Sequence, residues 1–530
     1  MRLVGILCLL ALWPSAARAE WLQASSAHFV VYADDSERDI QRFSERLERY
    51  HAAMALVTGA ETELPSPSNR VTVYVVRNER EVRALHGGNS KYIGGFYVPR
   101  AGGSLAIVPQ VNSGAGAPTF SMTVLLHEYA HHFLLSTSAF ATPRWLSEGS
   151  AEFMAAASFG TDGGVEIGKP AMHRAAELML PQFAVDVKAA DLIDPAAYEK
   201  RRSRSYDAFY GKSWLLYHYL TFDRARAGQL KTYIGLLVKG KSSREAGLEA
   251  FGDFDKLEAD LDRYLQVRRM LMLKLPANLL KTGPVAVRRL SAGEAAVMPI
   301  RIRSKRGVDD EQAKALVTEA RAVAARFPED AAVLAALAEV EHDAGNDNEA
   351  VAAADAALAR DPAEVNAYIQ KGLALMQLAA DARPDAQVAT YEKARRAFLA
   401  LNRRENDHPL PLIYNYQITV EVGREPSAQA LLGLERAMTV APFDLGLRMN
   451  LAMQQLRFGH HEKARANLIP VAYNPHGGGL AKAAAAAIER IDRDPKWDGS
   501  GLSGVSIEDD VAGEGGSDVR LWGTQVSGAR

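Results

Sequence analysis

The stretch His127-Glu128-Tyr129-Ala130-His131 restricts the possible folds more than any other part of this 530-residue chain. Residues four apart lie on the same face of a helix, so the two histidines would project their imidazoles toward one point. Two such nitrogens suit a zinc ion. Glu128 follows the first histidine, where its carboxylate can reach a water activated by the metal without binding the metal itself. We therefore predict a helix that carries part of a zinc site.

A second helix is predicted to supply the third ligand. Pro143 opens this helix, and Glu148 offers a hard oxygen that leaves the fourth position open, as catalytic zinc sites require. Glu152 lies one turn further on the same face, where it would either hydrogen-bond to the far nitrogen of a ligand histidine or be a solvated surface carboxylate. The alternative for the histidine pair is an amphipathic helix in which both rings are buried and hydrogen-bonded, or face solvent.

A catalytic zinc site also needs a hydrogen-bond donor for the negative charge that develops on the substrate oxygen. The predicted helix from Ser205 to Phe222 offers three candidates, Tyr210 first, then Tyr206 and then His218. Aromatic residues at helical spacing are more often part of a core, and that is the alternative for all three.

The segment from Met1 to Ala19 is typical of a secretory signal peptide. Arg2 supplies the positive charge, Leu3–Trp13 the apolar segment and Ala17–Ala19 a cleavage site of small residues. An uncleaved anchor is the alternative. The single cysteine, Cys8, lies in this segment, so the remaining chain forms no disulfide. No later stretch reaches the ~18 apolar residues of a spanning helix. We expect a protein secreted to the bacterial periplasm, with no transmembrane segment in the mature chain.

Local periodicity predicts a small mixed sheet packed on helices before residue 272. The predicted strands are His28–Tyr32, Val71–Val76, Gly94–Tyr97 and Leu105–Val108, and the predicted helices are Ser36–Leu56, Glu79–Leu85, Thr119–Leu135, the helix after Pro143, Ser205–Phe222, Leu230–Val238 and Phe254–Met272. Residues 160–205 show no clear pattern. The net charge of −2 gives no argument for nucleic acid as a partner.

Residues 273–308 look like a connector, because they are rich in proline and glycine and end in a basic run, Arg301–Arg306, that suits a solvated boundary. Beyond them a repeat begins. The spacing between Pro328 and Pro362 equals the tetratricopeptide period. Further units are predicted to end at Pro442 and near Pro475. A divergent unit with extra residues, which contains Tyr368 and Phe398, lies between Pro362 and the unit that ends at Pro442. These helix pairs would stack as an all-α solenoid.

Three of these stretches together resemble the gluzincin branch of zinc metallopeptidases. They are His127–His131, Trp145–Glu152 and Phe209–Trp214. Within that branch they resemble the bacterial peptidase MA-like family, which pairs such a domain with C-terminal tetratricopeptide repeats. The Phe29 strand and the Gly94–Tyr97 hairpin are also similar. The resemblance covers roughly residues 20 to 270. It does not extend to the aminopeptidases, since their Gly-x-Met-Glu-Asn motif is absent.

The resemblance implies an α+β zincin-like domain followed by an all-α tetratricopeptide-repeat solenoid. The predicted boundaries are a signal peptide at 1–19, the zincin-like domain at 20–272, a linker at 273–308, the repeats at 309–497 and a disordered tail at 498–530. The resemblance also implies that His127, His131 and Glu148 bind Zn²⁺ and that Glu128 is the catalytic acid and base. We expect a peptide or protein substrate, paired in extended form with residues 104–108, and a protein partner on the repeats. The alternative is an inactive zincin-like scaffold whose repeats bind proteins.

Overall fold

The computed structural model describes residues 21–60, 63–87, 93–109, 116–137, 140–180, 182–201, 205–474 and 477–501. These ranges contain 22 α-helices and nine β-strands. The predicted signal peptide, Pro475 and residues 502–530 of the predicted tail lie outside them. None of the described helices is both long and apolar enough to cross a membrane.

A six-stranded mixed sheet forms the centre of the N-terminal part. Strands β2, β3 and β5 are parallel, while β4 pairs antiparallel with β5, β1 with β2, and β9 with β1. The order is β4-β5-β3-β2-β1-β9, with bounds β1 Trp21–Ser25, β2 Phe29–Asp34, β3 Val71–Val76, β4 Phe96–Val98, β5 Leu105–Pro109 and β9 Ala286–Arg289. The four predicted strands are therefore present, and β1 and β9 are additions.

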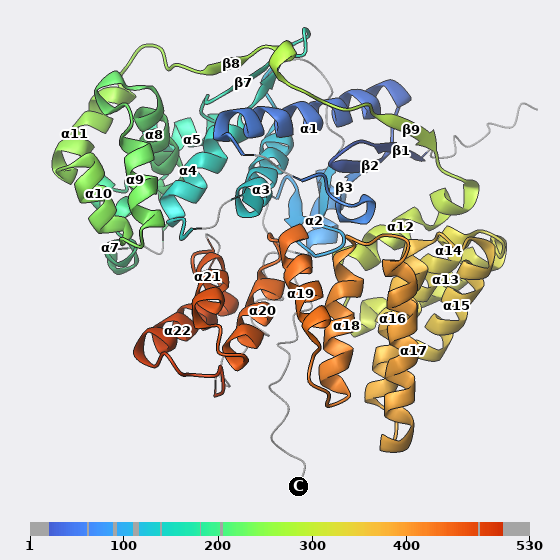
Figure 1. Ribbon diagram of the computed structural model, residues 1–530. Helices are drawn as coiled ribbons and strands as arrows, with labels where there is room; N and C mark the ends of the chain where they lie inside the picture. Colours follow the sequence, from blue (N-terminus) through green and yellow to red (C-terminus); the bar gives the residue numbers. More distant parts are fainter. Residues whose placement is uncertain are drawn as a thin grey trace, which may run out of the picture.

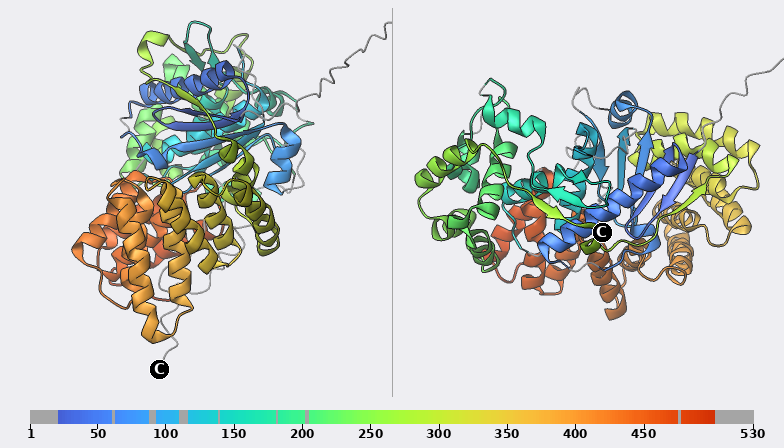
Figure 2. Two further views of the ribbon diagram at one scale, coloured as in Figure 1. Left: turned by 90° about the vertical axis from the view of Figure 1, so that its right-hand side faces the viewer. Right: turned by 90° about the horizontal axis from the view of Figure 1, so that it is seen from above.

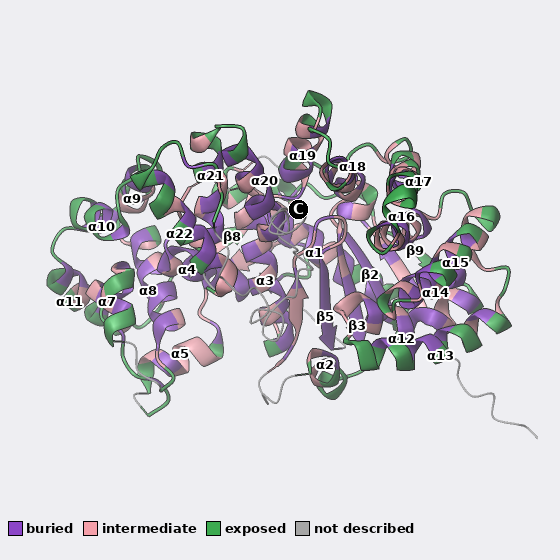
Figure 3. Ribbon diagram, turned by 90° about the horizontal axis from the view of Figure 1, so that it is seen from below, coloured by how far each residue is buried: buried purple, intermediate pink, exposed green. Residues whose placement is uncertain are grey.

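Both faces of this sheet are buried, and side chains that alternate along each strand divide between them. Phe29 and Val31 point to the face covered by α1 (Glu37–Thr58) and α3 (Phe120–Thr137). Tyr32 and its neighbour Tyr74 point to the face covered by α2 (Glu79–His86) and α12 (Ala292–Arg306). Figure 3 shows the central strands in the colour of buried residues.

After β5 and α3, the chain up to about residue 272 is mostly helical. A small three-stranded sheet packs with these helices. That sheet has the order β6-β7-β8. The bounds are β6 Ser158–Phe159, β7 Val165–Ile167, β8 Leu273–Leu275, α4 Arg144–Ala155, α5 Met172–Met179, α6 Ala189–Ile193, α7 Pro195–Arg201, α8 Phe209–Phe222, α9 Gln229–Val238, α10 Ser243–Phe251 and α11 Phe254–Leu265. Residues 160–205, where the sequence shows no pattern, thus hold a strand and three short helices.

The structure differs from the connector predicted at residues 273–308. This stretch completes both sheets with β8 and β9 and then forms α12. Met298 and Ile302 of α12 pack on the sheet, while Val297 and Ile300 pack on the first repeat helices. Arg301, predicted to be solvated, lies with its guanidinium carbon 5.3 Å from the centre of the Tyr32 ring. The helix has two apolar faces, so it joins the two parts of the molecule.

The repeat part consists of antiparallel helix pairs, as the tetratricopeptide period predicts. The bounds are α13 Asp310–Arg326, α14 Ala331–Asp343, α15 Asp347–Arg360, α16 Val365–Ala380, α17 Pro384–Asn402, α18 Pro409–Glu421, α19 Ala428–Val440, α20 Leu445–Arg457, α21 His461–Ala472 and α22 Gly479–Arg493. The turns inside the pairs α14/α15 and α20/α21 contain Gly345 and Gly459 at φ +75° and +74°, a conformation that other residues rarely adopt. Figures 1 and 2 show the repeat helices gathered on one side of the sheet domain.

Residues 498–501, predicted to begin the disordered tail, are described and lie beside the last repeat helices. Trp497 is buried against α20, α21 and α22, and a methyl group added at Gly499 would meet Met453 and Leu456 of α20. The packed repeat part therefore continues to at least residue 501.

Candidate metal centre

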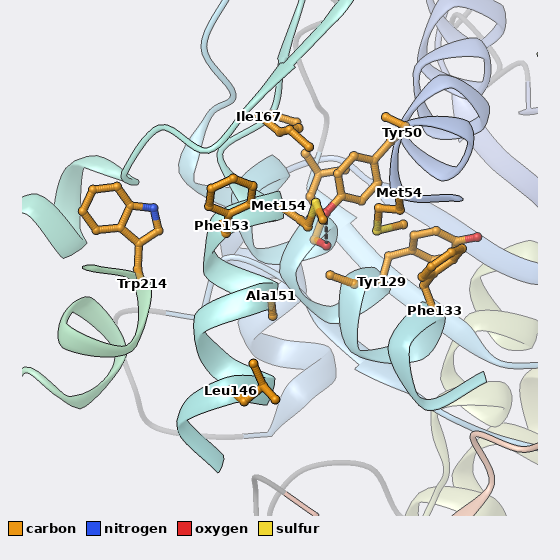
Figure 4. Packing of buried hydrophobic residues seen from close by; sticks show 14 of the residues in the cluster. Tyr50, Met54, Tyr129, Phe133, Leu146, Ala151, Phe153, Met154, Ile167 and Trp214 are labelled. Carbon is orange, nitrogen blue, oxygen red and sulfur yellow. Dashed lines mark hydrogen bonds between the residues drawn. The ribbon is translucent and has the colours of Figure 1, made fainter. Parts of the chain in front are cut away.

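Helix α3 is fixed by the face that it turns toward α1 and the sheet. Tyr129 and Phe133 pack there against Tyr50 and Met54 of α1 (Figure 4). The Tyr50 hydroxyl donates a hydrogen bond of 2.9 Å to the Leu126 carbonyl of α3. Because Tyr129 and Phe133 anchor this side of the helix, the face that carries the two motif histidines is held toward α4.

Helix α4 lies between α3 and α8, and it has no exposed side. All residues from Trp145 to Ala155 are buried, including the carboxylates of Glu148 and Glu152. The Trp145 indole nitrogen donates a hydrogen bond of 2.9 Å to the Tyr233 hydroxyl. Buried carboxylates are costly unless cations or hydrogen-bond donors satisfy them. The structure therefore has to provide such groups next to α4.

Gly149 allows α4 to approach α8 closely. A β-carbon at this position would lie 2.5 Å from the Ser213 carbonyl oxygen, and that oxygen belongs to the backbone and cannot swing away. We expect Gly149→Ala to lower the free energy of unfolding by about 1–3 kcal/mol through overpacking. Gly235→Ala is the matched control, because Gly235 lies in α9 with open space around it and should gain about 0.5–1 kcal/mol. Urea unfolding of the two variants measures both effects, and equal stability of the two would contradict this account.

Three side-chain atoms of the predicted metal ligands converge on one point. The Nε2 atoms of His127 and His131 lie 3.0 Å apart, and each lies 3.3 Å from Oε2 of Glu148. Two donors about 2.1 Å from a zinc ion at the tetrahedral angle would lie about 3.4 Å apart. The three residues that the sequence selected are thus brought together in a triangle of the size that zinc requires.

The electrostatics of the cluster favour a positive charge at its centre. Burial favours the neutral imidazole of His127, but the carboxylates of Glu152 and Glu148 outweigh it and raise the pKa of His127 to about 9. Burial likewise opposes ionisation of Glu148, but His131 and His127 hold the pKa of this carboxyl well below its usual range. Two buried carboxylates against two imidazoles form a site that stabilises a cation, either a proton or a metal ion.

One oxygen of the cluster lacks a hydrogen-bond partner. Oε1 of Glu148 is buried, and no described residue donates to it. A buried carboxylate oxygen without a donor is free to bind a ligand outside the polypeptide, and leaving it unsatisfied is unfavourable. Two imidazole nitrogens and a carboxylate are the donor set of many catalytic zinc sites. The residues present therefore fit a zinc ion.

Side chains beyond the triangle hold the two rings in orientation. Nδ1 of His131 lies 3.3 Å from the Ser147 hydroxyl, and Nδ1 of His127 lies 3.4 Å from Oε1 of Glu152. Groups on the far nitrogen fix how a ligand histidine faces a metal. Because Glu152 is only 2% exposed, it is not the solvated surface carboxylate that the sequence left open.

Arg174 of α5 partners Glu152, and no sequence pattern indicated this residue. Its Nη2 lies 2.7 Å from Oε1 of Glu152, and its Nη1 lies 2.6 Å from Oε1 of Glu177. Burial acts against the charge, but the two carboxylates raise the pKa of Arg174 above its usual value. Arg174 lies in the stretch without periodicity, 22 residues from Glu152, so only the folded structure brings the two together.

Of the three candidate oxyanion donors, Tyr210 lies at the cluster. Its ring centre is 6.3 Å from that of His127, and burial followed by the Glu148 charge raises the pKa of its hydroxyl. Tyr206 instead hydrogen-bonds to Glu177 and Arg174. His218 is fully buried away from the cluster, where it contacts the Leu271 carbonyl at 3.0 Å. His218 is therefore a core residue, which was the alternative for all three candidates.

Glu128 is half-buried on α3, beside the first ligand. Its negative charge contributes to the raised pKa of His127. It also acts, after burial, to raise the pKa of Tyr97 in β4. The Glu128 carboxylate is therefore within electrostatic range of both the ligand cluster and strand β4.

Strand β4 forms one edge of the six-stranded sheet. The prediction that a substrate pairs with residues 104–108 is therefore wrong. Those residues lie in β5, and β5 is paired on both sides by β3 and β4. A strand with both edges occupied cannot accept another strand. Among the described strands, the unpaired edge on this side of the sheet is that of β4, Phe96–Val98.

No protein-family model matches the sequence, and no curated protein matches it either. Among solved structures, the chain is similar to a thermophilic tetratricopeptide-repeat protein of Thermus thermophilus. The identity is 18% and the TM-score 0.32, and the match covers 37% of this chain and 100% of that chain. A TM-score this low supports no conclusion about the repeats.

Proposed function

We propose that this protein is a zinc-dependent peptidase, with zinc held by His127, His131 and Glu148. The observation that supports this most directly is the convergence of three donor atoms within 3.0–3.3 Å beside Glu128. When bound, zinc supplies a Lewis acid that polarises a carbonyl group and lowers the pKa of water toward about 7.

In the proposed reaction, the oxygen of a water molecule adds to the scissile carbonyl carbon and the carbon–nitrogen bond breaks. The Glu128 carboxylate takes a proton from the water and later delivers it to the leaving amine. The Tyr210 hydroxyl donates a hydrogen bond to the oxygen that becomes negatively charged. An extended peptide would pair through its main chain with the open edge of β4, since such pairing tolerates many sequences.

The repeats support a role in protein binding, because stacked helix pairs present extended surfaces to other polypeptides. We propose that they recruit the substrate or a partner of this exported peptidase. The alternative is that the N-terminal part is an inactive scaffold and that protein binding by the repeats is the whole function.

The proposal is tested on the chain that begins at Glu20, purified without added metal. We expect about one zinc ion per chain, and cleavage of casein that a zinc chelator abolishes and added zinc restores. Zinc without cleavage of casein or of a peptide library would favour the scaffold. A chain that binds no zinc would contradict the metal centre itself.

A further inference from the structure

The repeat part contacts α3 directly through the connection between α19 and α20. Because α3 carries His127 and His131, we call it the metal helix. Residues 440–448, which we call the docking segment, reach from the end of α19 into the first turn of α20. They pack with the neighbouring repeat helices against Leu135 of α3 and Ala101 of the turn between β4 and β5. The two parts of the molecule therefore share a hydrophobic core at this place.

Phe443 of the docking segment contacts the residue next to a metal ligand. Its ring centre lies 4.2 Å from that of His132, and Phe443 is only 4% exposed. The His132 ring also stacks on Tyr129, with ring centres 5.5 Å apart. Neighbouring side chains on a helix point about 100° apart, so clamping His132 limits rotation of α3 and hence the direction of His131.

Arg448 of the docking segment contacts the last turn of α3. Its Nη2 donates to the Leu135 carbonyl at 3.4 Å, and its Nε donates to the Pro442 carbonyl at 2.6 Å. The last four carbonyl groups of a helix have no partner within the helix, and a cation there is favourable. Arg448 therefore limits sliding of α3 along its axis, as Phe443 limits its rotation.

Asp444 ties the same segment to the β4–β5 turn. Its Oδ1 accepts the Leu447 amide at 2.8 Å and caps α20, while its Oδ2 accepts the Ala101 amide at 2.9 Å. The strand that leads into this turn carries Tyr97, whose hydroxyl lies 2.5 Å from Nδ1 of His132. The docking segment thus reaches His132 both directly, through Phe443, and indirectly, through the turn and β4.

Further contacts hold the N-terminal part and the repeats together. The Ser68 hydroxyl donates to Glu405 at 2.8 Å, and the Asn69 side-chain amide donates to the Val440 carbonyl at 2.6 Å. Gly102, at φ +76°, lies so close to the repeats that an added β-carbon would be 2.8 Å from Leu410. This face of the repeats is occupied by the protein's own N-terminal part, so it is not open to a partner.

We infer that the docking segment positions the metal helix, so that the repeats are a structural part of the metal centre as well as a binding surface. The inference rests on the proposed metal centre. Phe443, Asp444 and Arg448 are positioning residues, because they act through α3 and β4 and touch none of the three metal ligands. Metal sites require their ligands to be held within about 0.5 Å of the productive geometry, and residues that orient ligands from outside typically change metal affinity 10- to 100-fold.

The test compares Phe443→Ala with Phe458→Ala in the full chain that begins at Glu20. Phe458 is the matched control, because it lies at the other end of α20 and is 42% exposed. We expect the zinc dissociation constant, measured by competition with a chromogenic chelator, to rise at least tenfold for Phe443→Ala and less than twofold for Phe458→Ala. The visible spectrum of bound Co²⁺, which reports ligand geometry, should change only for Phe443→Ala. Phe443→Leu, which refills most of the space, should recover most of the affinity.

Arg448→Met removes the contact with α3 while keeping most of the side-chain length, and it decides the question if Phe443→Ala does not fold. A folded Phe443→Ala or Arg448→Met protein with wild-type zinc affinity and an unchanged Co²⁺ spectrum would overturn the inference. A wild-type protein that binds no zinc would instead overturn the proposed metal centre, so the two failures are distinguishable.

Discussion

Replacing Glu128 by glutamine is expected to slow peptide-bond hydrolysis by about 10²- to 10⁴-fold while zinc stays bound. The amide cannot accept a proton from water, but it has nearly the same shape as the carboxylate. Glu128 is half-buried and is not one of the three converging donors, so the change should spare both the fold and the metal. Steady-state cleavage of a fluorogenic peptide and the zinc content of the same sample measure the two effects.

Glu128→Asp is the control for this prediction. It keeps the carboxylate but draws it back by one methylene, so intermediate activity is expected if proton transfer is the role. Unchanged proteolysis in Glu128→Gln would refute the assignment of this residue. Loss of zinc along with activity would instead show that Glu128 contributes to holding the metal.

The elements that the sequence predicted well are those whose signal is local. The β-branched run of Val71–Val76 and the helical spacing of Ser36–Leu56 each lie within one element, and β3 and α1 occupy nearly those residues. The convergence of the three candidate ligands was predictable for a similar reason. His127 and His131 share one helix, and Glu148 lies at the start of the next, so a short chain segment sets their geometry.

The features that the sequence did not predict depend on pairing between distant segments. β9 joins the sheet beside β1, which lies at the opposite end of the N-terminal part in sequence, and no local pattern reports such a pairing. Arg174 reaches Glu152 only after α5 folds onto α4 and α8, because its own stretch has no periodicity. The proline and glycine of residues 273–308 predicted a loose connector, yet burial of the two apolar faces of α12 determines its structure.

Replacing Glu148 by glutamine is expected to weaken zinc binding at least 100-fold, more than any change outside the triangle. Glu148 supplies the negative charge that faces both imidazoles. The glutamine side-chain amide is neutral and is a poorer zinc ligand than a carboxylate. Glu152→Gln is the matched comparison, since it makes the same chemical change one helical turn away. Glu152 contacts Nδ1 of His127 and Arg174 but none of the converging atoms, so we expect a smaller loss of about tenfold.

The zinc affinities of Glu148→Gln and Glu152→Gln can be compared through the free energy of unfolding that each variant gains when zinc is added. A bound ligand stabilises the folded state by an amount set by its dissociation constant. At free zinc 100 times the wild-type dissociation constant, zinc should stabilise the wild type by about 2.7 kcal/mol, Glu152→Gln by about 1.4 kcal/mol and Glu148→Gln by at most about 0.4 kcal/mol. Unfolding in the presence of a chelator gives the metal-free stability of each variant and separates loss of zinc from loss of the buried Glu152–Arg174 pair. If Glu148→Gln kept the full zinc-dependent gain, the ion would have to be held elsewhere, and the buried oxygen of Glu148 would need a different explanation.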